Sequence, residues 1–198
     1  MIRIVDYGAG NLRSVENTLE AIGCRYEIVT RAEQLSGAEK VILPGVGHYG
    51  QIMRSLSASG LRGGLLELVR RGTPFLGICI GLQSLFEGSE EDPAVEGLGV
   101  FQGVIRRFDD RLRVPHMGWN QIAARKECAL LRGIPPDPYV YFAHSYYAPV
   151  VAATGAVCDY GLPYTALAEA DNVYGVQFHP EKSGAVGMQV IRNFVELA

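Results

Sequence analysis

The chain has 198 residues, of which 48% are hydrophobic and 20% charged, and its formal net charge at pH 7 is −3. This length predicts one domain with a sizeable core, and the even charge balance gives no reason to expect nucleic-acid or anionic-membrane binding. No apolar run approaches the roughly 18 residues of a membrane span, and the first residues lack the basic and apolar stretches of a secretory signal.

The first half of the chain alternates apolar runs with amphipathic segments. Strands are expected at residues 2–5, 26–29, 40–43 and 74–78. Helices are expected at 11–22, 49–71 (interrupted near Gly60 and Gly63-Gly64) and 80–86. Asn11 is a suitable N-cap for the first helix, because its side chain can accept a hydrogen bond from a free backbone N–H. This alternation of strands and helices predicts a parallel sheet with helices on both faces.

The second half is richer in strand patterns. Strands are expected at residues 100–108, 119–123, 139–146, 150–160, 165–170 and 173–178, followed by a helix at 185–197. The proline-rich stretch at 135–138 is interpreted as a rigid loop rather than a domain linker. The sequence therefore predicts one α/β domain over residues 1–198, with a central, mostly parallel sheet, flanking helices and an antiparallel strand extension.

The strongest chemical signal lies at Cys79, between Gly77 and Gly81, where an apolar run meets a helix-compatible run. This pattern predicts a strand, a sharp turn and a helix, with a nucleophile at the turn, where glycines are needed because side chains would be crowded. The dipole of the helix would favour a thiolate, and the Ile80 N–H would point towards an oxyanion. Gln83 lies one helical turn further on, so it faces the same site and could hold a polar substrate.

A second signal is the late segment His179-Pro180-Glu181. The proline pushes His179 towards extended geometry, and residues i and i+2 of an extended segment face the same side, so Glu181 could orient the imidazole. Together with Cys79, these residues indicate a cysteine nucleophile, a histidine base and acyl transfer through a thioester.

The remaining cysteines and histidines form no metal-binding or disulfide pattern. No Cys-x-x-Cys pair occurs among the widely spaced Cys24, Cys79, Cys128 and Cys158. Metal-ligand spacing is likewise missing at His48, His116 and His144. We therefore expect a reduced, cytoplasmic protein without a metal site.

The segment Pro44-Gly45-Val46-Gly47 follows the third expected strand and allows two interpretations. It could be an ordinary turn between a strand and a helix. It could instead be a loop whose peptide N–H groups complete an oxyanion hole, because Gly45 and Gly47 would permit a peptide flip that other residues resist. The spacing alone does not separate these interpretations.

The motif Gly-x-Cys-x-Gly-x-Gln, combined with a late His-Pro-Glu, resembles the class I (triad) glutamine amidotransferases. These motifs occupy residues 77–83 and 179–181, and their cysteine and histidine are 100 positions apart. Further segments resemble the glutaminase subunits of imidazole glycerol phosphate synthase, at residues 6–11, 43–47, 115–120, 144–146 and 179–183. The most discriminating of them is Pro-His-Met-Gly-Trp-Asn at 115–120, and the resemblance runs from the first strand to the last helix.

The resemblance implies an enzyme without a cofactor that hydrolyses glutamine to glutamate and ammonia through a Cys79 thioester. His179 and Glu181 would complete the triad. The residues implied to hold the oxyanion are Val46, Gly47 and Ile80. Those implied to hold the amino-acid end of glutamine are Gln83, Glu91, Ser145 and Tyr146.

The resemblance also implies a heterodimer with a (β/α)8-barrel cyclase subunit. In the family, that subunit uses the ammonia to make imidazole glycerol phosphate and an aminoimidazole carboxamide ribonucleotide in histidine biosynthesis. Exposed Trp and Met beside glycine are typical of interfaces. The candidates for this interface are Asn11, Arg13, Met117, Trp119 and Lys182.

Four other functions remain to be weighed against this one. The chain could be a stand-alone glutaminase, or the glutaminase subunit of another synthase such as pyridoxal phosphate synthase; residues 115–120 argue against both. It could be a cysteine hydrolase of the related peptidase type, although Gln83 and Glu181 favour amide side-chain chemistry. It could be a non-catalytic binding module, although the presence of all three triad residues argues against this.

Overall fold

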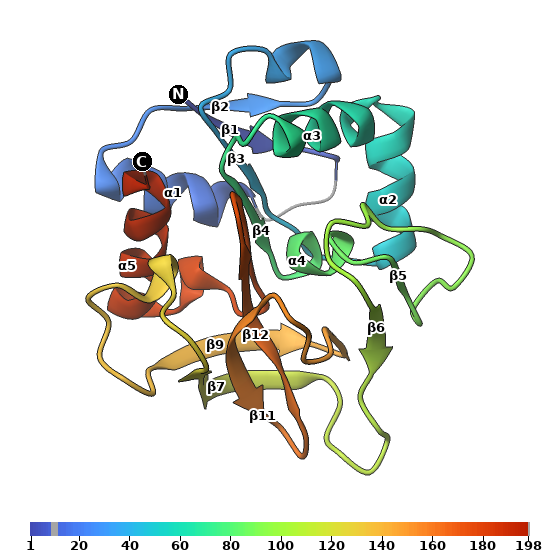
Figure 1. Ribbon diagram of the computed structural model, residues 1–198, viewed down its shortest axis with the longest axis vertical. Coiled ribbons are helices and arrows are strands. Elements are labelled where there is room, and N and C mark those ends of the chain that lie inside the picture. Colours follow the sequence, from blue (N-terminus) through green and yellow to red (C-terminus); the bar gives the residue numbers. More distant parts are fainter. Residues whose placement is uncertain (9–11, 198) are drawn as a thin grey trace.

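The computed structural model describes residues 1–8 and 12–197, and its main sheet has eight strands in the order β2-β1-β3-β4-β13-β12-β11-β8 (Figure 1). The strands of the parallel part are β2 (Tyr26–Val29), β1 (Ile2–Val5), β3 (Lys40–Leu43), β4 (Phe75–Ile78) and β13 (Val173–Val176). The sheet continues with antiparallel neighbours, β12 (Pro163–Ala170), β11 (Thr154–Asp159) and β8 (Ala123–Ala124). The predicted parallel sheet with an antiparallel extension is therefore confirmed.

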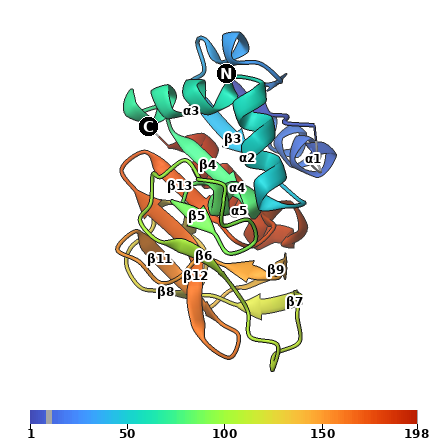
Figure 2. The ribbon, with the colours of Figure 1, turned by 90° about the vertical axis from the view of Figure 1, so that its right-hand side faces the viewer.

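Helices cover both faces of the parallel part (Figure 1, Figure 2). One face carries α1 (Leu12–Ile22) and α5 (Gly184–Glu196), and the other carries α2 (Tyr49–Ala58), α3 (Leu61–Arg70) and α4 (Ile80–Ser84). Side chains alternate along each strand, so Ile42 belongs to the core under α1 and α5, whereas Val41 and Leu43 belong to the core under α2 and α3. The sheet is thus buried on both faces, as its apolar parallel strands require.

Within the described residues, two smaller sheets adjoin the antiparallel part. β7 (His116–Gln121) pairs with β9 (Tyr139–His144), while β6 (Val104–Arg107) pairs with both β10 (Tyr146–Tyr147) and β5 (Gly88–Ser89). Only Ser145 separates β9 from β10, so one continuous segment links the two small sheets. None of the helices in residues 1–8 and 12–197 is both long and apolar enough to cross a membrane.

Several element boundaries differ from the expected ones. The helix expected at 80–86 ends at Ser84, because the carbonyls of residues 84–86 accept hydrogen bonds from the backbone of residues 98–101. The strand expected at 139–146 is divided at Ser145, and only Val104–Arg107 is a strand within 100–108. The interruption expected at Gly63-Gly64 is wrong, because both glycines lie within the continuous helix α3. The expected N-cap Asn11 lies outside the described residues, and α1 begins at Leu12.

Candidate active site

Neighbouring parallel strands bring the expected catalytic residues to one edge of the sheet. β4 leads directly into Cys79, and His179 follows the end of β13 by three residues. These two strands are hydrogen-bonded neighbours, and the Cys79 N–H donates to the Val176 carbonyl at 2.7 Å. On the other side of β4, β3 ends just before the segment 44–47. Residues far apart in sequence therefore meet at the carboxyl ends of the strands, where open α/β sheets bind ligands.

Cys79 occupies the sharp turn that the sequence predicts. Its backbone has a φ of 54° and a ψ of −107°, which is strained for a residue with a side chain. A Cβ on Gly81 would lie 2.0 Å from the Leu43 carbonyl oxygen, and one on Gly77 would lie 2.5 Å from the Gly81 carbonyl oxygen. Glycine is therefore required at both positions, and this close backbone packing holds Cys79 at the start of α4.

His179 and Glu181 meet, but not in the way that the sequence predicts. His179 Nδ1 donates to Glu181 Oε1 at 2.8 Å, and both side chains are 3% exposed. The expectation of an extended segment through both residues is wrong, because Pro180–Lys182 is a 3-10 turn that follows an extended His179. Proline is well suited to the first position of a helical turn, and Pro180 starts the turn that carries Glu181.

The backbone around this turn is fixed by β9. The His179 N–H donates to the Tyr141 carbonyl at 2.9 Å, and the Tyr141 N–H donates to Ser183 Oγ at 2.9 Å. Ser183 Oγ in turn donates to the His179 carbonyl at 2.7 Å. This closed set of hydrogen bonds sets the position of His179 relative to β9.

The imidazole of His179 lies between Cys79 and Glu181. Burial by itself would lower the pKa of His179, but hydrogen bonds to Cys79 and Glu181, together with their negative charges, raise it to about 10. Because Nδ1 is bonded to Glu181, the nitrogen that faces the sulfur is Nε2. At neutral pH the ring is therefore an imidazolium, which can pair with a thiolate and give a proton to a leaving group.

A cavity of about 230 Å³ opens in front of Cys79. Its lining includes every residue expected to hold the oxyanion or the substrate, namely Val46, Gly47, Ile80, Gln83, Glu91, Ser145 and Tyr146. It also includes Pro115, Met117, Ala143 and His144, which the sequence did not assign to a substrate site. The cavity is thus formed by the ends of β3 and β4, by the turn between β9 and β10, and by the start of β7.

Hydrogen bonds fix several side chains of this cavity. Gln83 Nε2 donates to the Tyr146 carbonyl at 2.8 Å and to Gln177 Oε1 at 3.1 Å, so Gln83 also holds the segment that carries Tyr146. Gln177 Nε2 lies 3.7 Å from Cys79 Sγ and donates to it. Glu91 Oε2 accepts a hydrogen bond from the first N–H of α2 at 2.7 Å. Gln177 was missed at the sequence level, although a glutamine in the apolar run 173–178 is a signal for a buried polar contact.

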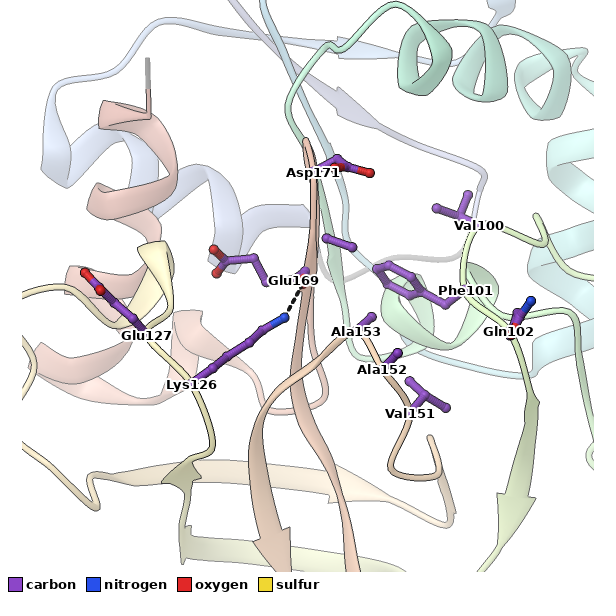
Figure 3. Close-up of a pocket in the computed structure, with 11 residues that line it drawn as sticks. Val100, Phe101, Gln102, Lys126, Glu127, Val151, Ala152, Ala153, Glu169 and Asp171 are labelled. Carbon is purple, nitrogen blue, oxygen red and sulfur yellow. Dashed lines mark hydrogen bonds between the residues drawn. The ribbon is translucent and has the colours of Figure 1, made fainter.

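A larger cavity of about 840 Å³ lies elsewhere, beside the edge of the antiparallel part (Figure 3). Figure 3 shows Lys126 reaching towards the strand of Glu169, where its Nζ donates to the Glu169 carbonyl at 2.9 Å. The eleven residues drawn around it include neither a cysteine nor a histidine. Size therefore does not favour the larger cavity as the candidate active site, whereas the chemistry around Cys79 favours the smaller one.

An exposed apolar surface lies next to the cavity on the outer face of β7 and β9. Met117 is 64% exposed, and Trp119 and Tyr139 are each 56% exposed. The rings of Trp119 and Tyr141 pack edge to face, with their centres 6.1 Å apart. Lys182 Nζ lies 6.0 Å from the centre of the Tyr141 ring. Of the residues expected at an interface, the structure therefore brings together Met117, Trp119 and Lys182.

The other two expected interface residues are less informative. Arg13 is exposed near the start of α1, the helix that contacts the turn of Lys182. Asn11 lies outside the described residues. We call the surface formed by Met117, Trp119, Tyr139, Tyr141 and Lys182 the β7–β9 face.

Behind this face, two buried histidines share one tyrosine. His144 Nδ1 donates to the Tyr146 carbonyl at 2.8 Å, and its Nε2 accepts from the Tyr164 hydroxyl at 3.2 Å. His116 Nδ1 lies 3.1 Å from the same hydroxyl. Burial lowers the pKa of His116 to about 4 and that of His144 to about 3, so both rings are neutral in the folded protein at neutral pH.

We expect this pair to make the protein unstable in mild acid. In the unfolded state these histidines have a pKa of about 6.5, so below pH 6.5 they bind protons that they do not bind in the folded state. The free energy of unfolding therefore falls as the pH falls. His144 alone should contribute a loss of about 2 kcal/mol between pH 7 and pH 5. His179 has a smaller and opposite effect in this window, because the stability that its raised pKa contributes is lost only as the pH rises above about 6.5. Urea unfolding should show a smaller pH dependence for His144→Gln than for the wild type; equal pH dependences would contradict the assignment.

Comparison with known proteins agrees with the fold and the motifs. Residues 3–197 match the model of the family Glutamine amidotransferase class-I, and the chain therefore belongs to the class-I glutamine amidotransferase family. A crystal structure of a glutamine amidotransferase has the same fold, with a TM-score of 0.79 at 20% identity, and covers 99% of this chain and 98% of that one. The predicted family is confirmed.

Curated relatives within this family are more similar still. The imidazole glycerol phosphate synthase subunit HisH of Deinococcus radiodurans is 46% identical and covers 98% of this chain and 92% of its own length. The subunit of the same name from Thermococcus kodakarensis is 48% identical over the full length of both chains.

Proposed function

We propose that residues 1–198 act as a single domain, the glutaminase subunit of an imidazole glycerol phosphate synthase, with Cys79, His179 and Glu181 as its catalytic triad. The observation that carries this proposal is the buried contact of Cys79 with His179 and of His179 with Glu181 at the mouth of a 230 Å³ cavity. The HisH relatives, which are 46% and 48% identical over nearly the whole chain, support the choice of synthase. The free state of all four cysteines suits a reduced cytoplasmic enzyme.

The proposed reaction begins when the Cys79 thiolate attacks the side-chain carbonyl carbon of glutamine. The carbonyl oxygen becomes an oxyanion, for which the Ile80 N–H and a peptide of the Val46–Gly47 segment are the proposed donors. When the carbon–nitrogen bond breaks, His179 gives its proton to the departing nitrogen, which leaves as ammonia and leaves a glutamyl thioester on Cys79. The neutral imidazole then takes a proton from water, which hydrolyses the thioester and releases glutamate.

The cavity suits the amino-acid end of glutamine. The carboxylate of Glu91 is held in place by the N-terminus of α2 and could pair with the substrate ammonium group. Gln83, Ser145 and Tyr146 line the same cavity and offer polar groups for the substrate carboxylate.

We propose that the β7–β9 face docks a (β/α)8-barrel cyclase subunit in a heterodimer. Exposed tryptophan, tyrosine and methionine at the centre of a surface are typical of hot spots, and this face borders the cavity through Met117. Ammonia released beside Met117 would then have a short route into the partner.

Replacing Trp119 with alanine is expected to weaken binding of such a cyclase subunit by about 100-fold. Tryptophans that become buried when two proteins bind are among the residues that contribute most to the binding free energy. Isothermal titration with a purified cyclase subunit would measure this change. Ile28→Ala is the matched control. Ile28 is an exposed apolar residue of β2, which is an edge strand of the main sheet, whereas β7 and β9 form a separate sheet. Equal weakening by both variants, or by neither, would contradict the docking proposal.

The proposed function is tested by measuring glutamate release from glutamine in three conditions: the chain alone, the chain with a cyclase subunit, and both with the nucleotide ligand of the cyclase. A slow rate alone and a large rise in the third condition are expected. Equal rates in all three would instead indicate a stand-alone glutaminase, and no release in any of them would exclude the proposal.

A further inference from the structure

One buried hydroxyl holds the backbone of the loop beside the nucleophile on both sides of Val46. Tyr7 lies two residues after β1, its side chain is 8% exposed, and its hydroxyl donates to the Val46 carbonyl at 3.2 Å. The same hydroxyl accepts a hydrogen bond from the Val46 N–H, also at 3.2 Å. These two backbone groups belong to successive peptide units, so neither peptide can rotate without breaking a bond to Tyr7.

The loop is packed closely on one side of Val46 and open on the other. A Cβ on Gly45 would lie 1.9 Å from Ile80 Cγ2 and 2.8 Å from the Tyr7 hydroxyl, so the chain passes tightly between that hydroxyl and the start of α4. At Gly47, φ is +109° and an added Cβ would meet nothing within 4 Å. The peptide after Val46, which carries the Val46 carbonyl and the Gly47 N–H, therefore has room to turn, and the hydrogen bond from Tyr7 to that carbonyl opposes the turn.

Tyr7 keeps both of its hydrogen-bonding roles at neutral pH. Burial raises the pKa of Tyr7, and the nearby negative charges of Cys79 and Asp6 raise it further. The hydroxyl therefore keeps its proton and can donate to the carbonyl while it accepts from the N–H.

We propose that Tyr7 is a positioning residue that keeps the N–H groups of the two peptides flanking Val46 from the oxyanion until the loop rearranges. This inference rests on the proposed function, which assigns the Val46–Gly47 segment to the oxyanion hole. In the observed arrangement the Val46 N–H donates a hydrogen bond to the Tyr7 hydroxyl, so it is not available to an oxyanion on Cys79. Turning the loop costs both bonds to Tyr7, and binding of the partner is the event that would compensate for their loss.

Tyr7→Phe tests the proposal, because it keeps the packed ring and removes only the hydroxyl. We expect kcat for glutamate release by the chain alone to rise by about tenfold with KM nearly unchanged, since two neutral hydrogen bonds no longer oppose the active loop. The rate of the full complex with nucleotide ligand should stay the same, so the stimulation by the partner should fall by the same factor. Tyr26→Phe is the matched control: its hydroxyl donates to Glu16 and Glu20, far from the site, and no kinetic change is expected.

Hydrogen exchange of the Val46 amide gives a second readout that does not depend on turnover. Exchange should be several-fold faster in Tyr7→Phe than in the wild type, and unchanged in Tyr26→Phe. If Tyr7→Phe fails to fold, the same exchange is measured in the wild-type chain. The Val46 amide should then exchange faster in the complex with nucleotide ligand than in the free chain. Unchanged exchange would overturn the role of Tyr7.

The outcomes separate this inference from the function on which it rests. If the wild type releases glutamate, Cys79→Ser does not, and Tyr7→Phe behaves as the wild type, then the proposed function stands and the role of Tyr7 is wrong. If the wild type releases no glutamate in any condition, the proposed function fails, and the exchange of Val46 still decides whether Tyr7 restrains the loop.

Discussion

Replacing Cys79 with serine is expected to reduce glutamate release by about 10⁴-fold or more, in the chain alone and in the complex. A serine hydroxyl beside His179 is a far weaker nucleophile than a thiolate, and removing the nucleophile of a triad usually abolishes nearly all of the rate. A coupled assay for glutamate measures the effect. The strained backbone at this position is unchanged by the substitution, so a loss of activity reports on the sulfur rather than on the fold.

Cys24→Ser is the matched control for this prediction. Cys24 is a free, half-buried cysteine that precedes β2, away from the carboxyl edge that carries the site. Its replacement should leave kcat unchanged. Retention of more than about a tenth of the activity by Cys79→Ser would contradict the role of Cys79 as nucleophile.

Gly81→Ala is expected to lower the free energy of unfolding by about 3 kcal/mol or more and to impair activity with it. The added Cβ would lie 2.0 Å from the Leu43 carbonyl oxygen, a backbone atom at the end of β3 that cannot move without displacing the sheet. Relief of that clash would push α4 away and change the position of Cys79. Urea unfolding followed by circular dichroism gives the loss of stability.

A second glycine provides the control, since Gly63 lies in α3 and an added Cβ there meets nothing within 4 Å. Gly63→Ala should stabilise the protein by up to about 1 kcal/mol, because alanine is the better helix former. If Gly81→Ala unfolded at the wild-type urea concentration, the close packing of β3 against α4 would not be a feature of the folded protein.

The parts of the site that are local in sequence could be predicted. The turn at Cys79 depends on Gly77, Gly81 and the apolar run that leads to Cys79, and all of these lie within the eight consecutive residues 74–81. The alternation of strands and helices in the first half likewise predicted the parallel part of the sheet, because β1, β3 and β4 each place apolar side chains in the core on either face.

The parts that depend on tertiary contacts could not. Tyr7, Gln177 and His144 act through partners 39, 98 and 20 positions away, and nothing in their immediate sequence indicates those partners. The sequence predicts an extended segment at Pro180 because a proline restricts the residue before it to extended geometry, whereas the proline itself begins a helical turn in the structure.

The same edge of the sheet now accounts for both chemistry and control. β4 carries the nucleophile, β13 leads to its base, β3 leads to the loop of Val46, and β1 leads to the tyrosine that restrains this loop. All four strands are parallel and adjacent, so the residues proposed for chemistry and for control lie side by side at one edge.

The measurement that tests the central claim most directly is the mass of the protein's peptides after acid quenching during turnover of glutamine by the complex with nucleotide ligand. We predict a glutamyl group on the peptide that contains Cys79 and on none of the peptides that contain Cys24, Cys128 or Cys158. A glutamyl group on another cysteine, or continued release of glutamate with no modified peptide and no loss of activity in Cys79→Ser, would contradict the proposed thioester mechanism.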